Sequence, residues 1–285
     1  MKKLLFQLDT DPHAAVFDTV VGFDGGADHV IGHGGCTPDN VRALVDGAIF
    51  TRSPKDKKNT ALFIGGSDMV AGEKLLDAVQ KVFFADFRVS VMLDSNGSNT
   101  TAAAAVAKLM SSGGVSGKKV VILGGTGPVG QRAAVMLNRE GAEVVLCSRG
   151  QERAQATCAV IRDRFGVDVI PLGTATSEDR ARAVEDAQIV IATGAAGVQL
   201  LDREAWENNS SIEMLADANA TPPLGIEGVD MMDRGKVRSG KTCWGAIGFG
   251  TLKLALHRAC IAKLFESNDQ VLDAEEIFAL AKTMV

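Results

Sequence analysis

The amino-acid sequence predicts an α/β protein of two domains, the second built on a doubly wound parallel sheet. Apolar segments of strand length alternate with segments of helical periodicity along most of the 285 residues. Strands that alternate with helices form parallel sheets through right-handed crossovers. A polar stretch, Asp94–Thr101, interrupts this alternation. We therefore expect an amino-terminal α/β domain over residues 1–97 and a second α/β domain over residues 98–285.

The elements of the first domain follow from buried apolar runs and helix start patterns. One helix is expected to begin at Thr37-Pro38, because proline suits the first helical position, and to continue through Val41–Gly47. A second helix begins at Ser67-Asp68 and continues through Glu73–Lys81. Three strands are expected, at Lys3–Leu8, Ala61–Gly65 and Phe87–Leu93.

The second domain begins after an interdomain hinge at Asp94–Thr101. The following run, Ala102–Met110, has the strongest helix composition in the chain. The chain ends with a long helix, Thr251–Phe265, and another begun by Asp273; either is able to pack against the first domain. Between these limits we expect strands at Lys119–Leu123, Glu143–Cys147, Asp168–Pro171, Gln188–Thr193 and Ser211–Ala216, and helices at Gln131–Glu140, Gln151–Phe165 and Ser177–Asp186.

A glycine-rich turn joins the first strand of this domain to its helix. Gly125 permits a tight turn, Gly127 lets backbone approach a pyrophosphate, and Gly130 lets the helix pack close to the strand. The free N–H groups and positive dipole end of the helix favour phosphate. The turn therefore predicts a Rossmann-type dinucleotide site formed by Gly125, Thr126, Gly127, Pro128, Val129 and Gly130.

The end of the next strand predicts which dinucleotide binds. An NAD-selective site has Asp or Glu about 20 residues beyond the glycines, to accept hydrogen bonds from the ribose 2′-hydroxyl. This chain has Ser148 and Arg149 there, and a guanidinium suits a phosphate. We expect NADP as the cofactor, with NAD as an alternative because only one cation is placed.

Ligands of open parallel sheets bind beyond the carboxyl ends of the strands. Three later segments satisfy this rule, namely Thr193–Gly197, Asp217–Ala220 and Gly245–Thr251. We expect them near the nicotinamide, although small residues at strand ends are also ordinary turn material. The cofactor residues predicted here are Thr193, Gly194, Ala195 and Asn219.

Polar side chains of the first domain are candidates for holding the substrate in a cleft. They comprise the hinge residues and acidic or histidine side chains near the amino end, for which solvated loops or helix caps are the alternative. The predicted substrate-binding residues are Asp24, His29, Asp94, Asn96, Asn99 and Thr100.

Lys253 stands in an apolar helix start and shares a face with His257, four residues on. It is either an active-site lysine or a side chain that extends to water. The chain contains no tyrosine, which excludes a Tyr-x-x-x-Lys proton relay, and no Cys or His spacing suggests a catalytic zinc.

Bulk properties indicate a small-molecule enzyme. The net charge of −5 and the lack of a long basic run argue against a nucleic-acid partner. No run approaches membrane-spanning length. Five scattered cysteines fit neither a disulfide framework nor a metal site, so the expected compartment is the cytoplasm.

Several longer segments resemble the NAD(P)-dependent methylene-tetrahydromethanopterin dehydrogenases of methylotrophic bacteria, over essentially the whole chain. The most specific are Lys3–Asp11 and Met92–Ala104, and the others are Val20–His29, Gly125–Gly130 and Leu254–Ser267. The resemblance implies a homo-oligomeric cytoplasmic enzyme with an amino-acid-dehydrogenase-like first domain. It also implies cofactor contacts at Thr126–Val129 and Arg149, and an active-site role for Lys253.

The resemblance implies oxidation of N5,N10-methylene-tetrahydromethanopterin to the methenyl form. This reaction explains why the chain needs no catalytic tyrosine. Removal of hydride from a carbon between two nitrogens leaves a resonance-stabilised amidinium cation, and no proton leaves in that step. Catalysis then needs the methylene carbon held roughly 3 to 3.5 Å from the nicotinamide C4. We expect Lys253 to orient the pterin, and Asp24 and Asp94 to supply favourable electrostatics.

Three alternatives to this assignment stay open. NADP-specific members of the family have Gly-Arg-Lys where this chain has Ser148-Arg149-Gly150, so NAD remains a possible cofactor. Methylene-tetrahydrofolate dehydrogenase is the enzymatic alternative. An NADP-binding sensor without catalysis is the non-enzymatic one.

Overall fold

The computed structural model describes residues 1–285. Contacts within the chain divide it into two compact units, which we call unit 1 and unit 2. Unit 1 contains residues 1–100 and 253–284, and unit 2 contains residues 101–252 with Val285. Each unit has a sheet of its own.

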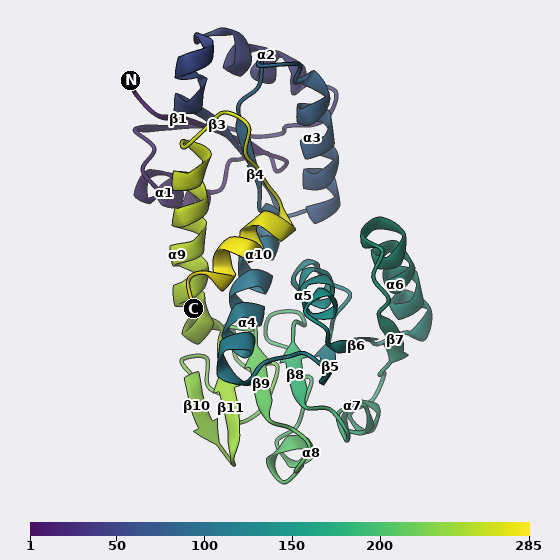
Figure 1. Cartoon of the computed structure of the whole chain (residues 1–285). Helices are drawn as coiled ribbons and strands as arrows, with labels where there is room; N and C mark the ends of the chain where they lie inside the picture. Colours follow the sequence, from purple (N-terminus) through teal and green to yellow (C-terminus); the bar gives the residue numbers. More distant parts are fainter. The chain divides into compact units, whose positions relative to one another are not determined.

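Unit 1 contains a five-stranded sheet in the order β12-β4-β3-β1-β2, and all of its paired strands are parallel (Figure 1). β3 is buried along its whole length, as its apolar sequence predicts. The sheet brings its carboxyl ends together, because Asp9 lies opposite Gly65 in the register of β1 and β3. The strands are β1 (Leu4–Asp9), β2 (His29–His33), β3 (Thr60–Gly65), β4 (Ser90–Leu93) and β12 (Val271–Leu272).

The helices of unit 1 pack on this sheet through a core of Leu, Ile and Val side chains. Asp68 caps α3, as predicted, by accepting hydrogen bonds from Val70 N and Ala71 N. Asp273 forms a capping box at α10. α1 and β2 were not predicted, because the segment that holds them is rich in glycine and polar residues. The helices are α1 (Val16–Asp24), α2 (Arg42–Phe50), α3 (Met69–Val82) and α10 (Ala274–Lys282), with a 3₁₀ helix at Pro54–Asn59.

Two long helices begin in one unit and end in the other. α4 (Ser98–Gly113) follows a 3₁₀ turn, Ser95–Gly97, in which Asn96 has a left-handed φ of 56°. α9 (Ala246–Leu264) begins in unit 2 and carries Lys253 and His257. The sequence-based boundary of the last long helix was wrong by one turn, since residues 246–250 are helical.

Unit 2 contains a seven-stranded sheet in the order β10-β11-β9-β8-β5-β6-β7. The strand order reverses between β5 and β8, which is where such sheets bind ligands. β10 pairs antiparallel with β11, so the sheet is not wholly parallel, and this edge hairpin was not predicted. The strands are β5 (Lys119–Leu123), β6 (Glu143–Ser148), β7 (Ile170–Gly173), β8 (Ile189–Ala192), β9 (Met214–Asp217), β10 (Arg234–Arg238) and β11 (Lys241–Trp244).

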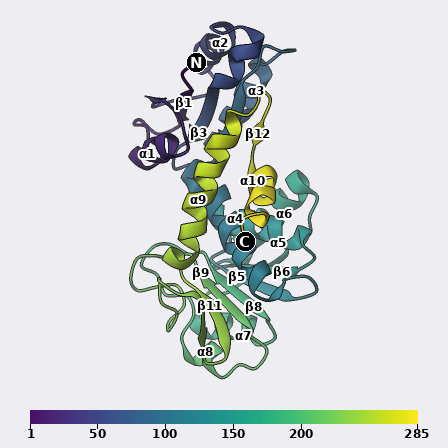
Figure 2. The same ribbon diagram turned by 60° about the vertical axis from the view of Figure 1, so that its left-hand side comes forward.

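Helices cover both faces of the sheet of unit 2. Figures 1 and 2 show α5 and α6 on one face and α7 and α8 on the other. This doubly wound arrangement confirms the predicted Rossmann architecture. The helices are α5 (Pro128–Arg139), α6 (Gln151–Phe165), α7 (Ser177–Ala183) and α8 (Glu204–Glu207).

Candidate functional site

The three glycines of the turn after β5 have different surroundings. A Cβ on Gly130 would lie 2.5 Å from Gly125 O, and a Cβ on Gly125 would lie 2.8 Å from Leu146 Cγ. Gly127 has only Thr193 O nearby, at 3.9 Å. The outer two glycines are therefore required by packing within the protein, whereas the middle one leaves room in which a ligand can approach the backbone.

Helix α5 starts directly behind this turn. Gly127 is its N-cap, Pro128 its first residue, and no side chain caps the helix. Such a start leaves N–H groups available for an anion. Thr193 adjoins the turn, because its backbone N–H donates to Leu123 O at 2.9 Å and its hydroxyl lies 3.3 Å from Gly124 O. The structure thus brings Gly125–Gly130, Thr193 and Gly194 together at the reversal of strand order.

The predicted 2′-phosphate residues lie at the end of β6. Ser148 is buried and its carbonyl accepts a hydrogen bond from Thr174 N at 2.7 Å. Arg149 is exposed and forms no hydrogen bond or ion pair within the chain. Its guanidinium is therefore free for a ligand.

Two other predicted cofactor segments have roles within the protein. Asn219 is buried and organises the loop after β9, where its Oδ1 accepts from Thr221 N at 2.9 Å and its Nδ2 donates to Pro223 O at 3.3 Å. Its Nδ2 also lies 3.5 Å from Ala195 O, so Asn219 and Ala195 are neighbours.

The glycines at the start of α9 are also explained by packing. Met231 O accepts from Ile247 N and Gly248 N, and Cβ atoms on Gly245 or Gly248 would lie 2.1 Å from Asp230 O or 1.7 Å from Asp233 O. The expectation that Gly245–Thr251 precedes the long helix is wrong for residues 246–251, because these residues form the first turns of α9. The N–H groups of Ile247 and Gly248 are already bonded within the protein.

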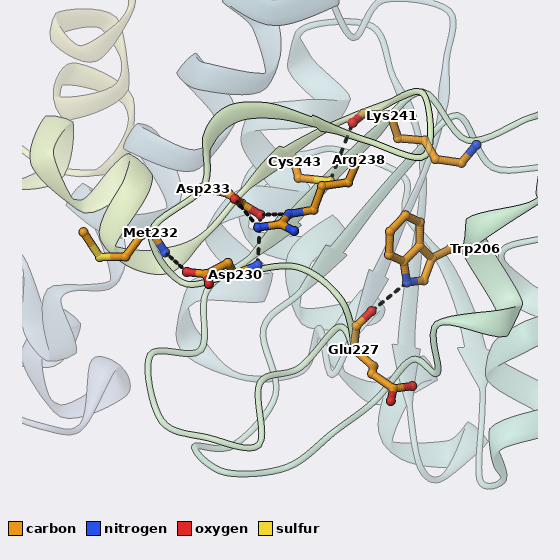
Figure 3. A network of polar contacts seen from close by, with 8 residues as sticks. All are labelled: Trp206, Glu227, Asp230, Met232, Asp233, Arg238, Lys241 and Cys243. Atoms are coloured by element: carbon orange, nitrogen blue, oxygen red, sulfur yellow. Dashed lines mark hydrogen bonds and ion pairs between the residues drawn. The ribbon is translucent and has the colours of Figure 1, made fainter.

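A polar network holds the loop against which α9 starts (Figure 3). Buried Asp233 accepts two hydrogen bonds from Arg238, at 2.5 Å from Nε and 2.8 Å from Nη2, and one from Asp230 N. A bidentate guanidinium–carboxylate pair fixes both position and orientation. The network therefore anchors the β10–β11 hairpin to the segment that leads into α9.

In unit 1, Asp94 follows β4 and is completely buried. Its Oδ1 accepts from Asn99 N and Thr100 N, at 2.9 and 3.0 Å, and its Oδ2 accepts from the Thr100 hydroxyl at 2.6 Å. Asn99 donates in turn to Leu93 O and Asp273. Asp94, Asn99 and Thr100 therefore build the start of α4, and of the four predicted hinge residues only Asn96 is exposed.

Two predicted substrate residues lie elsewhere in unit 1. Asp24 forms an exposed ion pair with Arg258 at 2.8 Å. His29 is the first residue of β2 and pairs with Leu4, at the amino end of the parallel sheet. The structure therefore does not bring Asp24 or His29 to the carboxyl-end edge where Asp94 lies.

Lys253 lies within a cluster of charged groups at that carboxyl-end edge. Its ammonium is 4.6 Å from the ring centroid of Phe17, a cation–π contact. Burial, and secondarily the charge of Asp94, raises the pKa of Asp18 to about 7, while Lys253 opposes this rise. Burial also raises the pKa of Asp94 to about 6. Lys253 and the hydrogen bonds that Asp94 accepts oppose this rise.

His257 completes the cluster from the next turn of α9. It is 1 % exposed, stacks on Phe63 with centroids 5.3 Å apart, and places Nδ1 4.0 Å from Asp94 Oδ2. Neither ring nitrogen has a hydrogen-bond partner. Burial, followed by repulsion from Lys253, lowers its pKa to about 3, so the imidazole is neutral.

Sequence reasoning placed Lys253 and His257 on one helix face but missed Phe17 as their neighbour. It did not single out Asp18 among the acidic side chains near the amino end. The available indication was the position of Asp18 in the first turn of a helix that follows a strand, but α1 itself was not predicted.

No helix of the protein is long and apolar enough to cross a membrane.

The chain is similar to known proteins over part or all of its length. A family model described as methylene-tetrahydromethanopterin dehydrogenase, N-terminal, matches residues 16–96. The chain is 59% identical to a bifunctional protein MdtA of Methylorubrum extorquens, over 99% of both chains. It is 32% identical to an NAD(P)-dependent methylenetetrahydromethanopterin dehydrogenase of the same organism, over 98% of both chains.

Solved structures resemble the chain in fold alone. A shikimate 5-dehydrogenase from Mycobacterium fortuitum aligns with a TM-score of 0.54 at 13% identity, over 98% of each chain. A shikimate 5-dehydrogenase from Thermus thermophilus in complex with NADP(H) and shikimate aligns with a TM-score of 0.50 at 13% identity, over 100% of each chain. Both support an architecture of two α/β domains.

Proposed function

Because this chain belongs to the family of NAD(P)-dependent methylene-tetrahydromethanopterin dehydrogenases, we propose that it transfers hydride from N5,N10-methylene-tetrahydromethanopterin to NADP. The product is the methenyl form of the carrier. The similarity to an NAD(P)-dependent methylenetetrahydromethanopterin dehydrogenase, 32% identical over 98% of both chains, carries this proposal. We propose that this reaction belongs to one-carbon metabolism, downstream of formaldehyde.

The residues of unit 2 fit a dinucleotide. Gly127 leaves a space that a Cβ would occupy, and the uncapped start of α5 lies beside it. Residues Gly125–Gly130 with Thr193 would hold the pyrophosphate side, and Arg149 with Ser148 the ribose 2′-phosphate. When bound, the dinucleotide supplies the hydride acceptor. NAD is the alternative cofactor, because Arg149 is the one cation in the predicted 2′-phosphate position.

The residues of unit 1 fit a reaction without acid or base catalysis. Loss of hydride from a carbon between two nitrogens leaves an amidinium cation, so no proton has to leave. The neutral His257 has no partner that would make it a relay, and the chain has no tyrosine. Lys253 is only partly buried and therefore accessible to the pterin ring, which we propose it orients.

Assembly and compartment follow from surface and cysteine chemistry. Val16, Val20 and Phe23 recur at helical spacing on α1 and are exposed, which favours a homo-oligomer in which this face is covered. All five cysteines are free and buried, as suits a reducing cytoplasm. We propose no nucleic-acid or membrane partner.

A spectrophotometric assay at the nicotinamide absorbance tests the proposal with two carriers and two nucleotides. We expect the highest rate with methylene-tetrahydromethanopterin and NADP. A higher kcat/KM with methylene-tetrahydrofolate would instead assign the folate reaction, and NADP binding without turnover of either carrier would indicate a sensor. Either outcome overturns the proposal.

Two matched variants test the assigned residues in the same assay. Lys253→Ala should lower kcat/KM about 100-fold without changing NADP affinity, because it removes a contact to the pterin alone. Lys263→Ala, ten residues along α9 in an exposed pair with Glu266, is the control. Arg149→Ala should reduce the preference for NADP over NAD about tenfold.

A further inference from the structure

Asp18 is the carboxylate of unit 1 that lacks a hydrogen-bond donor at the candidate site. It lies in the first turn of α1 and is partly buried. Its Oδ2 is 3.3 Å, and Asp9 Oδ2 is 3.1 Å, from the position that a Cβ on Gly65 would take. Two carboxylates therefore converge on the carboxyl end of β3.

The neighbouring carboxylates are satisfied by the protein. Asp9 accepts from Asp11 N at 2.9 Å and from Ala15 N at 3.0 Å. Asp94 accepts from two backbone N–H groups and one hydroxyl. The local backbone thus fixes Asp9 and Asp94, whereas Asp18 is left with only electrostatic neighbours.

Charges around Asp18 do not balance within the protein. The groups that face it are Asp94 from the end of β4, Lys253 from α9 and Asp9 from the end of β1. His257 is the remaining titratable group of the cluster, and its buried, unpartnered ring is uncharged. Three carboxyl groups therefore share one ammonium. An excess of negative charge in a partly buried place favours a ligand that brings positive charge.

We propose that the ionised Asp18 carboxylate, acting beside Lys253, stabilises the cationic methenyl product relative to the neutral methylene substrate. This inference rests on the proposed function and assigns the charge-setting residue of that site. Asp18 acts through the electrostatic field, without proton transfer. Protonation of Asp18 therefore weakens binding of the cation and leaves binding of the neutral form almost unchanged.

The effect is visible as a pH dependence of carrier binding, not of the overall equilibrium. Hydride transfer from the methylene carrier to an oxidised dinucleotide gives a cation and a reduced dinucleotide, and no proton enters or leaves. The ratio of kcat/KM in the two directions is therefore independent of pH. Burial and Asp94 place the pKa of Asp18 at about 7, so its charge changes in the physiological range.

Equilibrium titration of the two carrier forms, from about pH 6 to about pH 8, tests the inference. For the wild-type protein we expect the Kd of the methenyl form to fall about tenfold as pH rises, as unit charges several ångströms apart would produce. The Kd of the methylene form should change less than about twofold. Asp18→Asn should bind the methenyl form weakly at every pH, and Asp18→Glu should restore the slope.

Asp77→Asn is the matched control, because it removes an exposed carboxylate from α3 of the same unit. It should reproduce the wild-type titration. A wild-type protein whose affinities for both forms change in parallel, or an Asp18→Asn variant that keeps the slope, overturns the inference. A wild-type slope shows that a group titrating in this range acts on the cation. Because the pKa of Asp94 is raised as well, loss of the slope in Asp18→Asn, a variant expected to be stabilised, assigns the effect to Asp18.

The failure of this inference is distinguishable from failure of the proposed function. If hydride transfer to NADP proceeds normally but the methenyl affinity is independent of pH, only the role of Asp18 is wrong. If neither carrier form binds and no transfer occurs, the proposed function is wrong as well.

Discussion

The glycine turn of unit 2 and the charged cluster of unit 1 use opposite means to prepare a site. The turn is contiguous in sequence, consists of backbone, and excludes side chains at Gly125 and Gly130. The cluster combines Asp18 and Lys253, which are far apart in the chain, and contains ionisable groups in partial or complete burial. The turn prepares its site by leaving room beside the backbone, and the cluster prepares its site through the charges of its side chains.

This difference predicts different responses to substitution. In the glycine turn, an added methyl group should impair ligand binding at any pH, because it clashes with backbone whose displacement costs free energy. A site made of buried charge responds to pH, and removal of one charge can stabilise the fold. Substitutions in the glycine turn and in the charged cluster test that contrast.

Gly130→Ala should abolish measurable NADP binding and lower the free energy of unfolding by about 3 kcal/mol, because its Cβ would lie 2.5 Å from Gly125 O. Gly127→Ala should weaken NADP binding by at least about tenfold but leave stability within about 1 kcal/mol, since its Cβ faces open space. Urea unfolding and NADP titration measure both. If the two variants were equally stable, Gly130 would not be required by packing in the way that distinguishes it from Gly127.

Asp94→Ala should destabilise unit 1 by about 2 kcal/mol, because it leaves two N–H donors and a hydroxyl at the start of α4 unpaired in a buried place. Thermal or urea unfolding at about pH 7 measures the change. Asp94→Asn, which retains an acceptor oxygen, is the intermediate control. A stabilised Asp94→Ala variant would show that its charge, rather than its hydrogen bonds, dominates.

Asp18→Asn should stabilise the protein by about 1 kcal/mol above pH 7. The folded-state pKa of Asp18 is raised from 3.8 to about 7, so stability present in acid is lost as pH rises through that interval. Asn imitates the protonated carboxyl, so the difference should vanish near pH 4. Urea midpoints at the two pH values measure it. An increase of the same size at both would contradict the ionisation account.

His257→Phe should give the smallest effect, below about 1 kcal/mol near pH 7, with better tolerance of acid. Its pKa is lowered to about 3, so the native protein loses stability as pH falls from about 6.5 toward 3. Phe cannot protonate and keeps the stacking on Phe63. Acid unfolding midpoints of the two proteins test this, and a variant more sensitive to acid than wild type would refute it.

Much of the fold could be predicted from the sequence, with errors where local pattern is weak. β5 and α6 have the predicted bounds, and β3, α3, β6 and β8 differ from them by a residue or two at an end. Their apolar runs and caps are local features that tertiary contacts reinforce. α1, β2 and the β10–β11 hairpin were missed, because Gly and charged residues obscure their periodicity.

The candidate site likewise contains features that are local in the sequence and features that depend on tertiary contacts. The sequence by itself predicted the glycine turn and the cationic residue after β6, since both are properties of a short stretch. Only the structure shows that Arg149 is exposed and unpaired. The sequence also determined that Lys253 lies on the same helix face as His257.

Only the tertiary structure decided that Asp18 joins Lys253, that Asp94 is consumed by capping α4, and that Asp24 is paired at the surface with Arg258. The physical reason is that desolvation and charge–charge energies depend on three-dimensional distance and burial. Residues far apart in the chain acquire those values only when parallel strands align their carboxyl ends.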